Sequence, residues 1–224
     1  MKILQASPDT QINPWENLAP QKITKKLIAV TGYARSGKGS LCDALERNLK
    51  REIPNLSIGQ FAFAESLRRE LAPFLMENFS IDAWTSDTKK KEIIRPLLIG
   101  HGMARRASSE NQYWIKKIEQ QIEQSQDDLC LINDLRFAEN DTDELAWLHQ
   151  NKGLHIHIRR FTEKSEKRIY EKAPNEYEKQ NEQKLIKAAK EVVEIPRYET
   201  DEEFFVKINK ISLEIISKNY QYLL

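Results

Sequence analysis

The sequence predicts a three-layer α/β/α fold in which helices cover both faces of a mostly parallel, five-stranded sheet. The first observation behind this prediction is an apolar strand pattern at 26–31 that leads through a glycine-rich turn into a helical pattern. The second is a further apolar segment at 57–63, which completes a strand–helix–strand unit. The third is the apolar run at 129–132. It leads to Asp134, as a buried parallel strand does when it delivers a carboxylate to the ligand edge of a sheet.

The turn at 32–40 has the composition of a phosphate-binding loop. Gly32, Gly37 and Gly39 are three of only seven glycines in the chain, so backbone freedom is concentrated here. Backbone N–H groups of such a turn, together with the N-terminus of the next helix, surround an anion, and Lys38 would neutralise its outer charges. The alternative is an ordinary strand-to-helix turn with an exposed lysine, which leaves the gathering of glycines without a reason.

Composition gives no reason to expect a nucleic-acid or membrane partner. The 224 residues include 35 Lys and Arg against 34 Asp and Glu, a net charge of +1. No apolar run approaches the roughly 20 residues that span a bilayer. Cys42 and Cys130 fall in patterns that predict burial, and the N-terminus has no signal-peptide pattern. These features predict a reducing cytoplasm, that of a host cell if the protein is viral.

The chain divides into an extension and one domain. Residues 1–22 hold three prolines without periodicity and predict an N-terminal extension, whereas 23–224 predict a single domain. Residues 64–124 are helical, rich in arginine and too long for a simple crossover between strands, which indicates an inserted lobe. The further elements are expected as helices at 65–79, 86–101, 110–124, 139–151 and 201–219, and as strands at 154–160 and 191–196.

The polar segment at 159–185 leaves two interpretations open. Its many Lys and Glu residues suit a solvated helical face, whereas its place after the fourth strand suits a mobile lid over bound phosphates. His155 and His157 on the preceding strand point to one face. Their spacing would suit a metal ion, but a polar strand face is the simpler interpretation.

The combination of a phosphate-binding loop, a carboxylate at a strand end and many arginines favours phosphoryl transfer, which depends on positioning and charge neutralisation. Lys38 is expected to hold the β- and γ-phosphates of ATP, and arginines would bind an acceptor phosphate bidentately. Asp134 is expected to hold Mg²⁺, directly or through water. The residues expected to bind ATP are Gly32, Arg35, Ser36, Gly37, Lys38, Gly39 and Ser40.

Gly39 separates Lys38 from Ser40, and this arrangement is similar to the Gly-Lys-x-Thr form of nucleoside monophosphate kinases. In that form the hydroxyl group tends to contact phosphate, while the metal is held largely by water and ATP. Asp134, acting through water, is therefore a better candidate for the metal than Ser40.

Several segments, in order, resemble the bacteriophage-type deoxynucleoside monophosphate kinases, which are P-loop kinases. The loop at 32–40 looks like theirs, although Gly39 stands where they often have Asp. The other matching segments are FAFAESLR at 61–68, RPLLIGHGMARR at 95–106 with Tyr113 and Trp114 after it, INDLRFAEN at 132–140, and HIRR at 157–160. Ile99 and Met103 replace the Gln and Thr of that family. The resemblance covers roughly residues 27–160.

The resemblance implies a P-loop kinase fold with a helical monophosphate-binding lobe at 64–124 and a lid at 159–185. It implies the reaction of ATP and a deoxynucleoside monophosphate (dNMP) to ADP and a deoxynucleoside diphosphate (dNDP), with Mg²⁺. The implied catalytic residues are Lys38, Asp134, Arg136, Arg159 and Arg160. The implied substrate-binding residues are Arg68, Arg95, Arg106 and Trp114. For each arginine a surface ion pair is the alternative, and for Trp114 it is packing in the core.

Two other functions remain open at this point. Because the loop identifies only the phosphate donor, the chain could be a kinase of another small metabolite, such as dephospho-coenzyme A or a sugar acid. A regulatory nucleotide-binding NTPase is the third hypothesis, but it leaves the arginine-bearing lobe without a role. The expected partner is a small nucleotide. The sequence leaves open which bases are accepted and whether the chain forms a homodimer.

Overall fold

The fold is described by a computed structural model that covers residues 23–165, 167–173, 176–198 and 200–223. The extension expected at 1–22 lies outside the described residues. The strands are β1 (Lys26–Thr31), β2 (Ile58–Phe61), β3 (Leu129–Ile132), β4 (Leu154–Lys164), β5 (Lys167–Tyr170) and β6 (Glu191–Pro196). The helices are α1 (Lys38–Glu52), α2 (Phe63–Phe79), α3 (Thr88–Ala107), α4 (Gln112–Gln124), α5 (Glu144–Gln150), α6 (Glu176–Ala188) and α7 (Asp201–Leu223).

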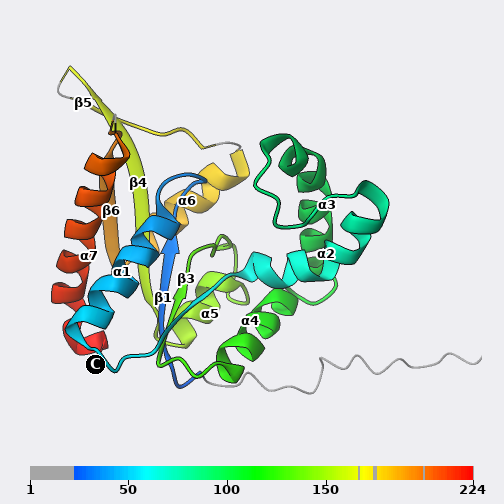
Figure 1. The fold of residues 1–224 in the computed structure, drawn as a ribbon, viewed down its shortest axis with the longest axis horizontal. Helices are drawn as coiled ribbons and strands as arrows, with labels where there is room; N and C mark the ends of the chain where they lie inside the picture. The colour runs from blue at the N-terminus through cyan, green and yellow to red at the C-terminus, as the bar shows by residue number, and fades with distance from the viewer. Residues whose placement is uncertain (1–22, 166, 174–175, 199, 224) are drawn as a thin grey trace, which may run out of the picture.

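The sheet is mostly parallel, as the sequence predicts. Five strands pair in parallel in the order β2-β3-β1-β4-β6, and β5 adds a sixth strand antiparallel to the end of β4. Parallel pairing requires long crossover connections, and the helices supply them (Figure 1). Since parallel strands all end at one edge, the turns that follow β1, β3 and β6 meet at that edge.

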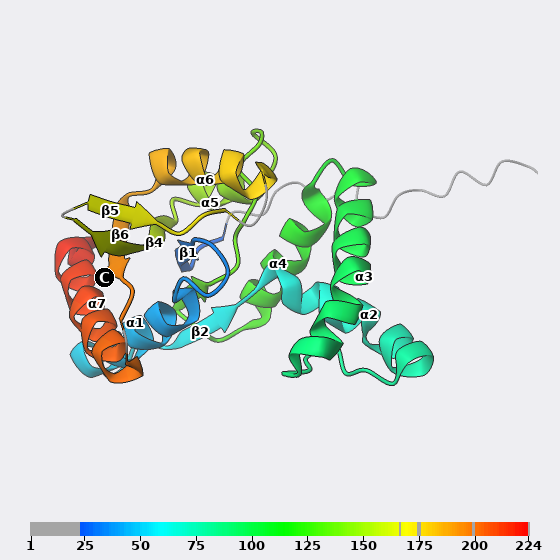
Figure 2. The ribbon, with the colours of Figure 1, turned by 90° about the horizontal axis from the view of Figure 1, so that it is seen from above.

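Strand alternation divides the core into two layers. On β1, Ile28 and Val30 pack with α1 and α7, whereas Leu27 and Ala29 pack with α4 and α5. All four side chains are fully buried, because a central parallel strand is covered on both faces. Figure 2 shows α1 and α7 on one side of the sheet and α5 and α6 on the other.

The helices α2 and α3 project from the sheet as a separate lobe (Figure 1). This lobe has a small core of its own, formed by Leu75, Ile81, Ala83 and Ile94. The third helix of the expected insertion, α4, behaves differently, because its buried isoleucines belong to the main core beside β1 and β3. Helix α4 therefore joins the lobe to the sheet.

The polar segment after the fourth strand is a hairpin followed by a helix. β4 continues to Lys164, beyond its expected end at residue 160, and turns back into β5. Phe161 is 4% exposed and its ring packs against Tyr170 across the hairpin, a cross-strand aromatic pair of the kind that stabilises such hairpins. A solvated helical face over this whole segment is therefore wrong, and among its described residues the helix is α6 alone.

Candidate active site

The loop between β1 and α1 requires glycine at two positions. Gly32 has a φ of 143° and Gly37 a φ of 99°, and both values lie in the region that side chains rarely adopt. A Cβ atom on Gly32 would meet the carbonyl oxygen of Ile158, and one on Gly37 would lie 2.8 Å from the ring of Phe204. Gly39 has open space around it, so packing does not require glycine at that position.

The N-terminus of α1 is open to an anion. Gly37 caps this helix without any side-chain hydrogen bond, and the first turn contains no acidic residue. The first N–H groups of a helix need partners from outside the helix, and together with the helix dipole they favour a phosphate group. The loop therefore has the local structure that the sequence predicts for phosphate binding.

Lys38 lies at the centre of this loop. Its Nζ donates to the carbonyl oxygens of Gly32, at 2.8 Å, and of Tyr33, at 2.7 Å. Burial lowers the pKa of Lys38 to about 8, and the neighbouring Arg136 guanidinium lowers it further, against the opposing charge of Asp134. A buried ammonium beside another cation is poised to bind an anion, because a phosphate would relieve both effects.

A cavity of about 760 Å³ opens beside the loop. Its lining includes five of the residues expected to bind ATP: Arg35, Gly37, Lys38, Gly39 and Ser40. The rest of the lining consists of Asn133, Arg160, Arg197, Tyr198, Thr200, Asp201 and Phe204. These residues come from the ends of β1, β3, β4 and β6 and from the start of α7, so the cavity lies at the edge where the parallel strands end.

Arg159 and Arg160 lie on opposite faces of the sheet, because successive residues of a strand alternate. Arg160 lines the cavity, and its guanidinium lies 5.1 Å from the centre of the Phe204 ring. Arg159 lies 3.6 Å from Glu182 and 3.7 Å from Glu194, and it stacks on the ring of Tyr170. The structure therefore brings Arg160, but not Arg159, to the cavity beside Lys38.

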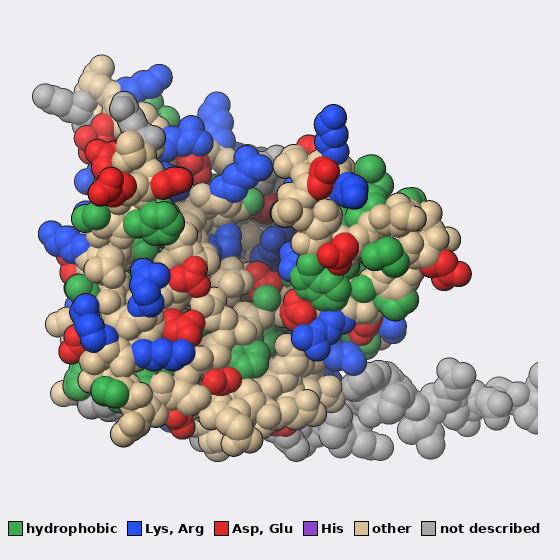
Figure 3. Space-filling view, in the orientation of Figure 1, with side chains coloured by type: hydrophobic (Ala, Val, Ile, Leu, Met, Phe, Trp, Pro, Cys, Tyr) green, Lys and Arg blue, Asp and Glu red, His purple; other side chains and the backbone are tan. Residues whose placement is uncertain are grey.

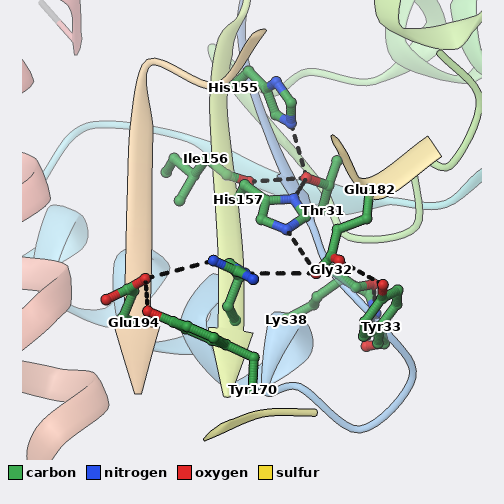
Figure 4. A network of polar contacts seen from close by, with 11 residues as sticks. Thr31, Gly32, Tyr33, Lys38, His155, Ile156, His157, Tyr170, Glu182 and Glu194 are labelled. Carbon is green, nitrogen blue, oxygen red and sulfur yellow. Dashed lines mark hydrogen bonds and ion pairs between the residues drawn. The ribbon is translucent and has the colours of Figure 1, made fainter. Parts of the chain in front are cut away.

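A polar network links the loop to α6 (Figure 4). The hydroxyl of Tyr33 donates to Glu182 on α6 at 2.5 Å, and His157 Nε2 lies 3.9 Å from the same carboxylate. Burial opposes ionisation of Glu182, but the hydrogen bond from Tyr33 and the charges of Arg159 and His157 keep its pKa below the ordinary value. Sequence reasoning did not identify Glu182, because its contacts join segments far apart in the chain.

His155 and His157 are both 1% exposed and share the hydroxyl of Thr31, which lies 2.8 Å from a ring nitrogen of each. Burial lowers the pKa of His155 to about 3, and the charges of His157 and His149 lower it further. This pairing supports the interpretation of a polar strand face, because Thr31 on the neighbouring strand bonds one nitrogen of each ring, while His155 Nδ1 and His157 Nε2 have no hydrogen-bond partner within the described part of the chain.

Asp134 joins the sheet to the helical lobe. Its two carboxylate oxygens accept from the backbone N–H groups of Phe63 and Ala64, each at 2.8 Å, at the start of α2. Burial raises the pKa of Asp134, whereas these two bonds and the guanidiniums of Arg136 and Arg68 lower it. Because each oxygen makes one such bond, each retains a further lone pair.

Several cations gather around Asp134. The charges of Arg136 and Arg68 act on its carboxylate, and Arg136 also acts on Lys38. In the space-filling view, Lys and Arg side chains lie in the hollow between the α/β core and the helical lobe (Figure 3). The structure therefore groups Lys38, Asp134, Arg136 and Arg68 within range of one another's charges.

Arg106 is a buried cation with incomplete bonding. It is 3% exposed, its guanidinium lies 3.5 Å from the centre of the Phe137 ring, and one of its nitrogens, NH1, has no hydrogen-bond partner. Its ion pair with Glu139 spans 4.0 Å, and its charge also acts on the buried carboxyl of Glu144. Buried donors are normally paired, so the free nitrogen indicates a place for a ligand.

Two expected substrate-binding residues lie elsewhere. Trp114 is 4% exposed, and its indole N–H donates to the carbonyl oxygen of Gly102 at 3.0 Å. The expected contact between Trp114 and substrate is therefore wrong, and the residue packs in the core. Arg95 is exposed and precedes Arg106 by three helical turns of α3, about 16 Å along the axis. The Cα atom of Arg95 is therefore far from that of Arg106, and the two side chains leave α3 at different places.

The side chains of this site could help to hold a magnesium ion that is bound mainly by the phosphates of a nucleotide and by water. Ser40 lines the cavity and Asp134 retains lone pairs, so these residues could orient water around the ion. Across the described part of the chain, no group of three or more His, Cys, Asp or Glu side chains could hold a metal ion by itself. Mg²⁺ usually keeps several waters and binds through one or two carboxylates plus substrate phosphates.

Sequence reasoning missed the cavity residues that follow β6. Arg197, Tyr198 and Thr200 line the cavity together with Asn133. The available signal was their position directly after apolar strands, because the ends of parallel strands meet at one edge. None of these residue types is distinctive enough to be selected from the sequence alone.

No family model matches the chain, and the search of curated proteins found no match. Among solved structures, the chain is similar to a dephospho-CoA kinase from Campylobacter jejuni, with 15% sequence identity and a TM-score of 0.43. That match covers 87% of this chain and 99% of the other. Similarity at this level carries no information about substrate, so the functional argument depends on the residues of this chain. No helix within the described residues is both long and apolar enough to cross a membrane.

Proposed function

We propose that the chain is an ATP-dependent kinase of deoxynucleoside monophosphates. It would transfer the γ-phosphoryl group of ATP to an oxygen of the dNMP phosphate, giving ADP and a dNDP. The observation that carries this proposal is a pair of cationic regions on either side of Lys38. One is the open loop with its cavity, and the other is the arginine group around Asp134.

The loop side suits the phosphate donor. Lys38 and the open N-terminus of α1 favour the β- and γ-phosphates of ATP. Arg160 and Tyr198 on the cavity wall offer a cationic plane and an aromatic ring, and both kinds of group stack on nucleobases. Asp134 and Ser40 would orient the water shell of a bound Mg²⁺, which would supply neutralisation of the phosphate charge of ATP.

The arginine side suits an acceptor that carries its own phosphate. Arg68, Arg106 and Arg136 come from α2, α3 and the loop after β3, and guanidiniums bind phosphate bidentately. An uncharged hydroxyl acceptor would instead benefit from a free carboxylate as general base. The carboxylates of Asp134 and Glu144 in this region are both engaged by backbone N–H groups, which favours a phosphate acceptor.

The proposed reaction needs positioning more than covalent chemistry. The acceptor oxygen must approach the γ-phosphorus in line with the leaving oxygen of ADP. Lys38 contacts the donor phosphates, and Arg136, whose charge acts on Lys38, would neutralise the charge that develops between donor and acceptor. No protein nucleophile is required.

The test is a panel of acceptors with ATP and Mg²⁺, in which ADP release is followed for each. The panel contains the four common dNMPs, the matching ribonucleoside monophosphates, and phosphorylated and hydroxylated non-nucleotides. The proposal predicts that at least one dNMP accelerates ADP release by more than about a hundredfold over ATP alone. Acceleration only by a non-nucleotide would identify a kinase of another metabolite, and slow release unaffected by every acceptor would identify a regulatory NTPase. Either result would refute the proposal.

A further inference from the structure

The loop between β3 and α5, residues 133–143, carries three groups of the site without regular secondary structure. Asn133 lines the cavity, Asp134 holds the start of α2, and the charge of Arg136 acts on Lys38. An irregular segment has no ladder of backbone bonds to fix it. Its geometry must come from side chains that bind its backbone.

Two consecutive buried acids supply those bonds. One carboxylate oxygen of Glu144 accepts from the backbone N–H of Arg136, at 2.7 Å, and from that of Phe137, at 3.2 Å. Asp143 accepts from the backbone N–H groups of Glu139 and Asn140. Asp143 and Glu144 therefore bind four N–H groups of the loop that precedes them.

Burying these two carboxyl groups costs free energy, and packing contacts alone would not offset that cost. Asp143 is fully buried and Glu144 is 3% exposed, and moving a carboxyl group out of water is unfavourable unless it is well bonded. Asp143 occupies the N-cap position of α5 but makes no side-chain cap bond to that helix. Both carboxyl groups thus serve the loop rather than α5.

Glu144 accepts hydrogen bonds from the backbone of Arg136 and Phe137, and both residues adjoin the proposed site for the acceptor phosphate. Arg136 is the cation beside Lys38, and the ring of Phe137 lies against the guanidinium of Arg106. A shift of this backbone by about an ångström would move both contacts, and shifts of that size commonly reduce catalysis by about a hundredfold.

We propose that Glu144 is a positioning residue, which holds the backbone of Arg136 and Phe137 so that the guanidiniums of Arg136 and Arg106 meet the acceptor phosphate. This inference rests on the proposed kinase function. It adds a residue that none of the sequence motifs includes and that does not itself contact substrate.

The charged groups that face Glu144 come from two other elements: Asp134 after β3 and Arg106 on α3. A test must therefore separate the hydrogen bonds of Glu144 from its charge. Glu144→Gln keeps an oxygen of the same reach but cannot ionise, whereas Glu144→Asp keeps a titratable carboxyl group and shortens the side chain by one methylene. Asp141→Asn, at an exposed position of the same loop, is the matched control.

The experiment measures amide hydrogen exchange at Arg136 and Phe137 in the full chain, together with kcat and KM for the dNMP and for ATP. For Glu144→Asp, exchange at both amides is expected to rise about tenfold or more, and kcat/KM for the dNMP to fall about tenfold, with KM for ATP unchanged. Glu144→Gln and Asp141→Asn should remain close to the wild-type protein in all these measurements.

Unchanged exchange and kinetics in Glu144→Asp would overturn the inference. Equal impairment in Glu144→Gln would also overturn it, because that variant keeps the bonding oxygen. Exchange at the amides of β1 and β3 verifies that each variant is folded. If the wild-type protein phosphorylates no dNMP, the proposed function fails, whereas the exchange comparison still tests whether Glu144 holds the loop.

Discussion

Lys38 is a half-buried cation and Arg106 is a fully buried one, 3% exposed. Lys38 bonds only to carbonyl oxygens of its own loop among the contacts described, and one nitrogen of Arg106 has no hydrogen-bond partner. A buried charge without a full set of partners is unfavourable, so both sites gain free energy when an anion binds. In the proposed function, Lys38 would bind the donor phosphates and Arg106 the acceptor phosphate.

Replacing Arg106 should weaken acceptor binding. Arg106→Ala is expected to raise KM for the dNMP by about tenfold or more, because it removes a bidentate cation, with KM for ATP little changed. The control is Arg105→Ala, since Arg105 is exposed and pairs with Glu70 on the lobe; its KM for the dNMP should stay within about twofold of wild type. An increase confined to KM for ATP would instead assign Arg106 to the donor.

The lowered pKa of Lys38 predicts weaker nucleotide binding at alkaline pH. Below pH 8 the side chain carries its charge, and above pH 8, in the ligand-free protein, it progressively loses it. The affinity for ADP, measured by calorimetry between pH 6.5 and 9.5, should therefore fall as pH rises through that value. Arg136→Gln removes a neighbouring cation, so it should move the decrease to higher pH, whereas Arg47→Gln at an exposed position of α1 should not. An unchanged midpoint in Arg136→Gln would contradict this reading of the site.

At the scale of elements, the position of α1 is set by the loop before it. Gly37 adopts a backbone conformation that starts the helix without a side-chain cap, and its lack of a side chain leaves room for Phe204 of α7. The network of Tyr33, Glu182 and His157 holds α6 beside the same loop (Figure 4). Helices on both faces of the sheet thus contribute to the geometry of one loop.

A matched pair of substitutions tests this requirement. Gly37→Ala combines a strained φ with a Cβ contact of 2.8 Å to Phe204, so it should destabilise the protein by about 1–3 kcal/mol and weaken ADP binding. Gly39→Ala meets open space within the first turn of α1, and should leave the free energy of unfolding unchanged or raise it by about 0.5–1 kcal/mol. Urea unfolding of both variants decides the question. Equal destabilisation would show that the backbone at Gly37 has no special role.

The sequence predicts the elements whose determinants are local. The loop at 32–38, the buried strands and the amphipathic helices follow from glycine spacing and hydrophobic periodicity. The expected bounds differ most clearly at α3, which is expected to end at residue 101 but ends at Ala107, and at α5, which is expected to begin at residue 139 but begins at Glu144. The β4–β5 hairpin was not predicted, because its strands are exposed and polar and depend on the Phe161–Tyr170 pair. Strand alternation places Arg159 and Arg160 on opposite faces of the sheet. The sequence motif predicted the same role for both arginines, so it did not separate them.

At the scale of the whole molecule, the sheet and the lobe are joined by the packing of α4 and by polar connections. Asp134 ties the end of β3 to the start of α2, and Glu144 ties the same loop to α5. These connections could not be predicted from the sequence, because they pair a side chain with backbone groups of distant or irregular segments. They place Arg136 and Arg68 relative to the loop that holds Lys38.

The buried carboxyl of Glu144 should make global stability depend on pH. Burial raises its pKa to about 8, opposed by the Arg136 N–H bond and assisted by the charge of Asp134. Between about pH 4.5 and 8 the group is ionised in the unfolded chain and protonated in the native one, so its contribution to the free energy of unfolding falls as pH rises. Glu144→Gln removes this titration.

Urea unfolding at pH 5 to 9 checks this expectation. The stability of Glu144→Gln relative to wild type should increase with pH by up to about 1.4 kcal/mol per pH unit and level off above pH 8. The same comparison for Asp141→Asn, at an exposed position, should show no such trend. A constant difference for Glu144→Gln would mean that the carboxyl has an ordinary pKa in the native state.

The most direct test of the central claim follows the γ-phosphoryl group of ATP itself. ATP labelled at the γ-phosphate is incubated with the protein, Mg²⁺ and the dNMP that most accelerates ADP release, and the labelled products are separated. The account predicts that the label moves to the dNDP, and that Lys38→Ala abolishes this transfer while the protein stays folded. Label recovered only as inorganic phosphate, or transfer at a normal rate in Lys38→Ala, would contradict it.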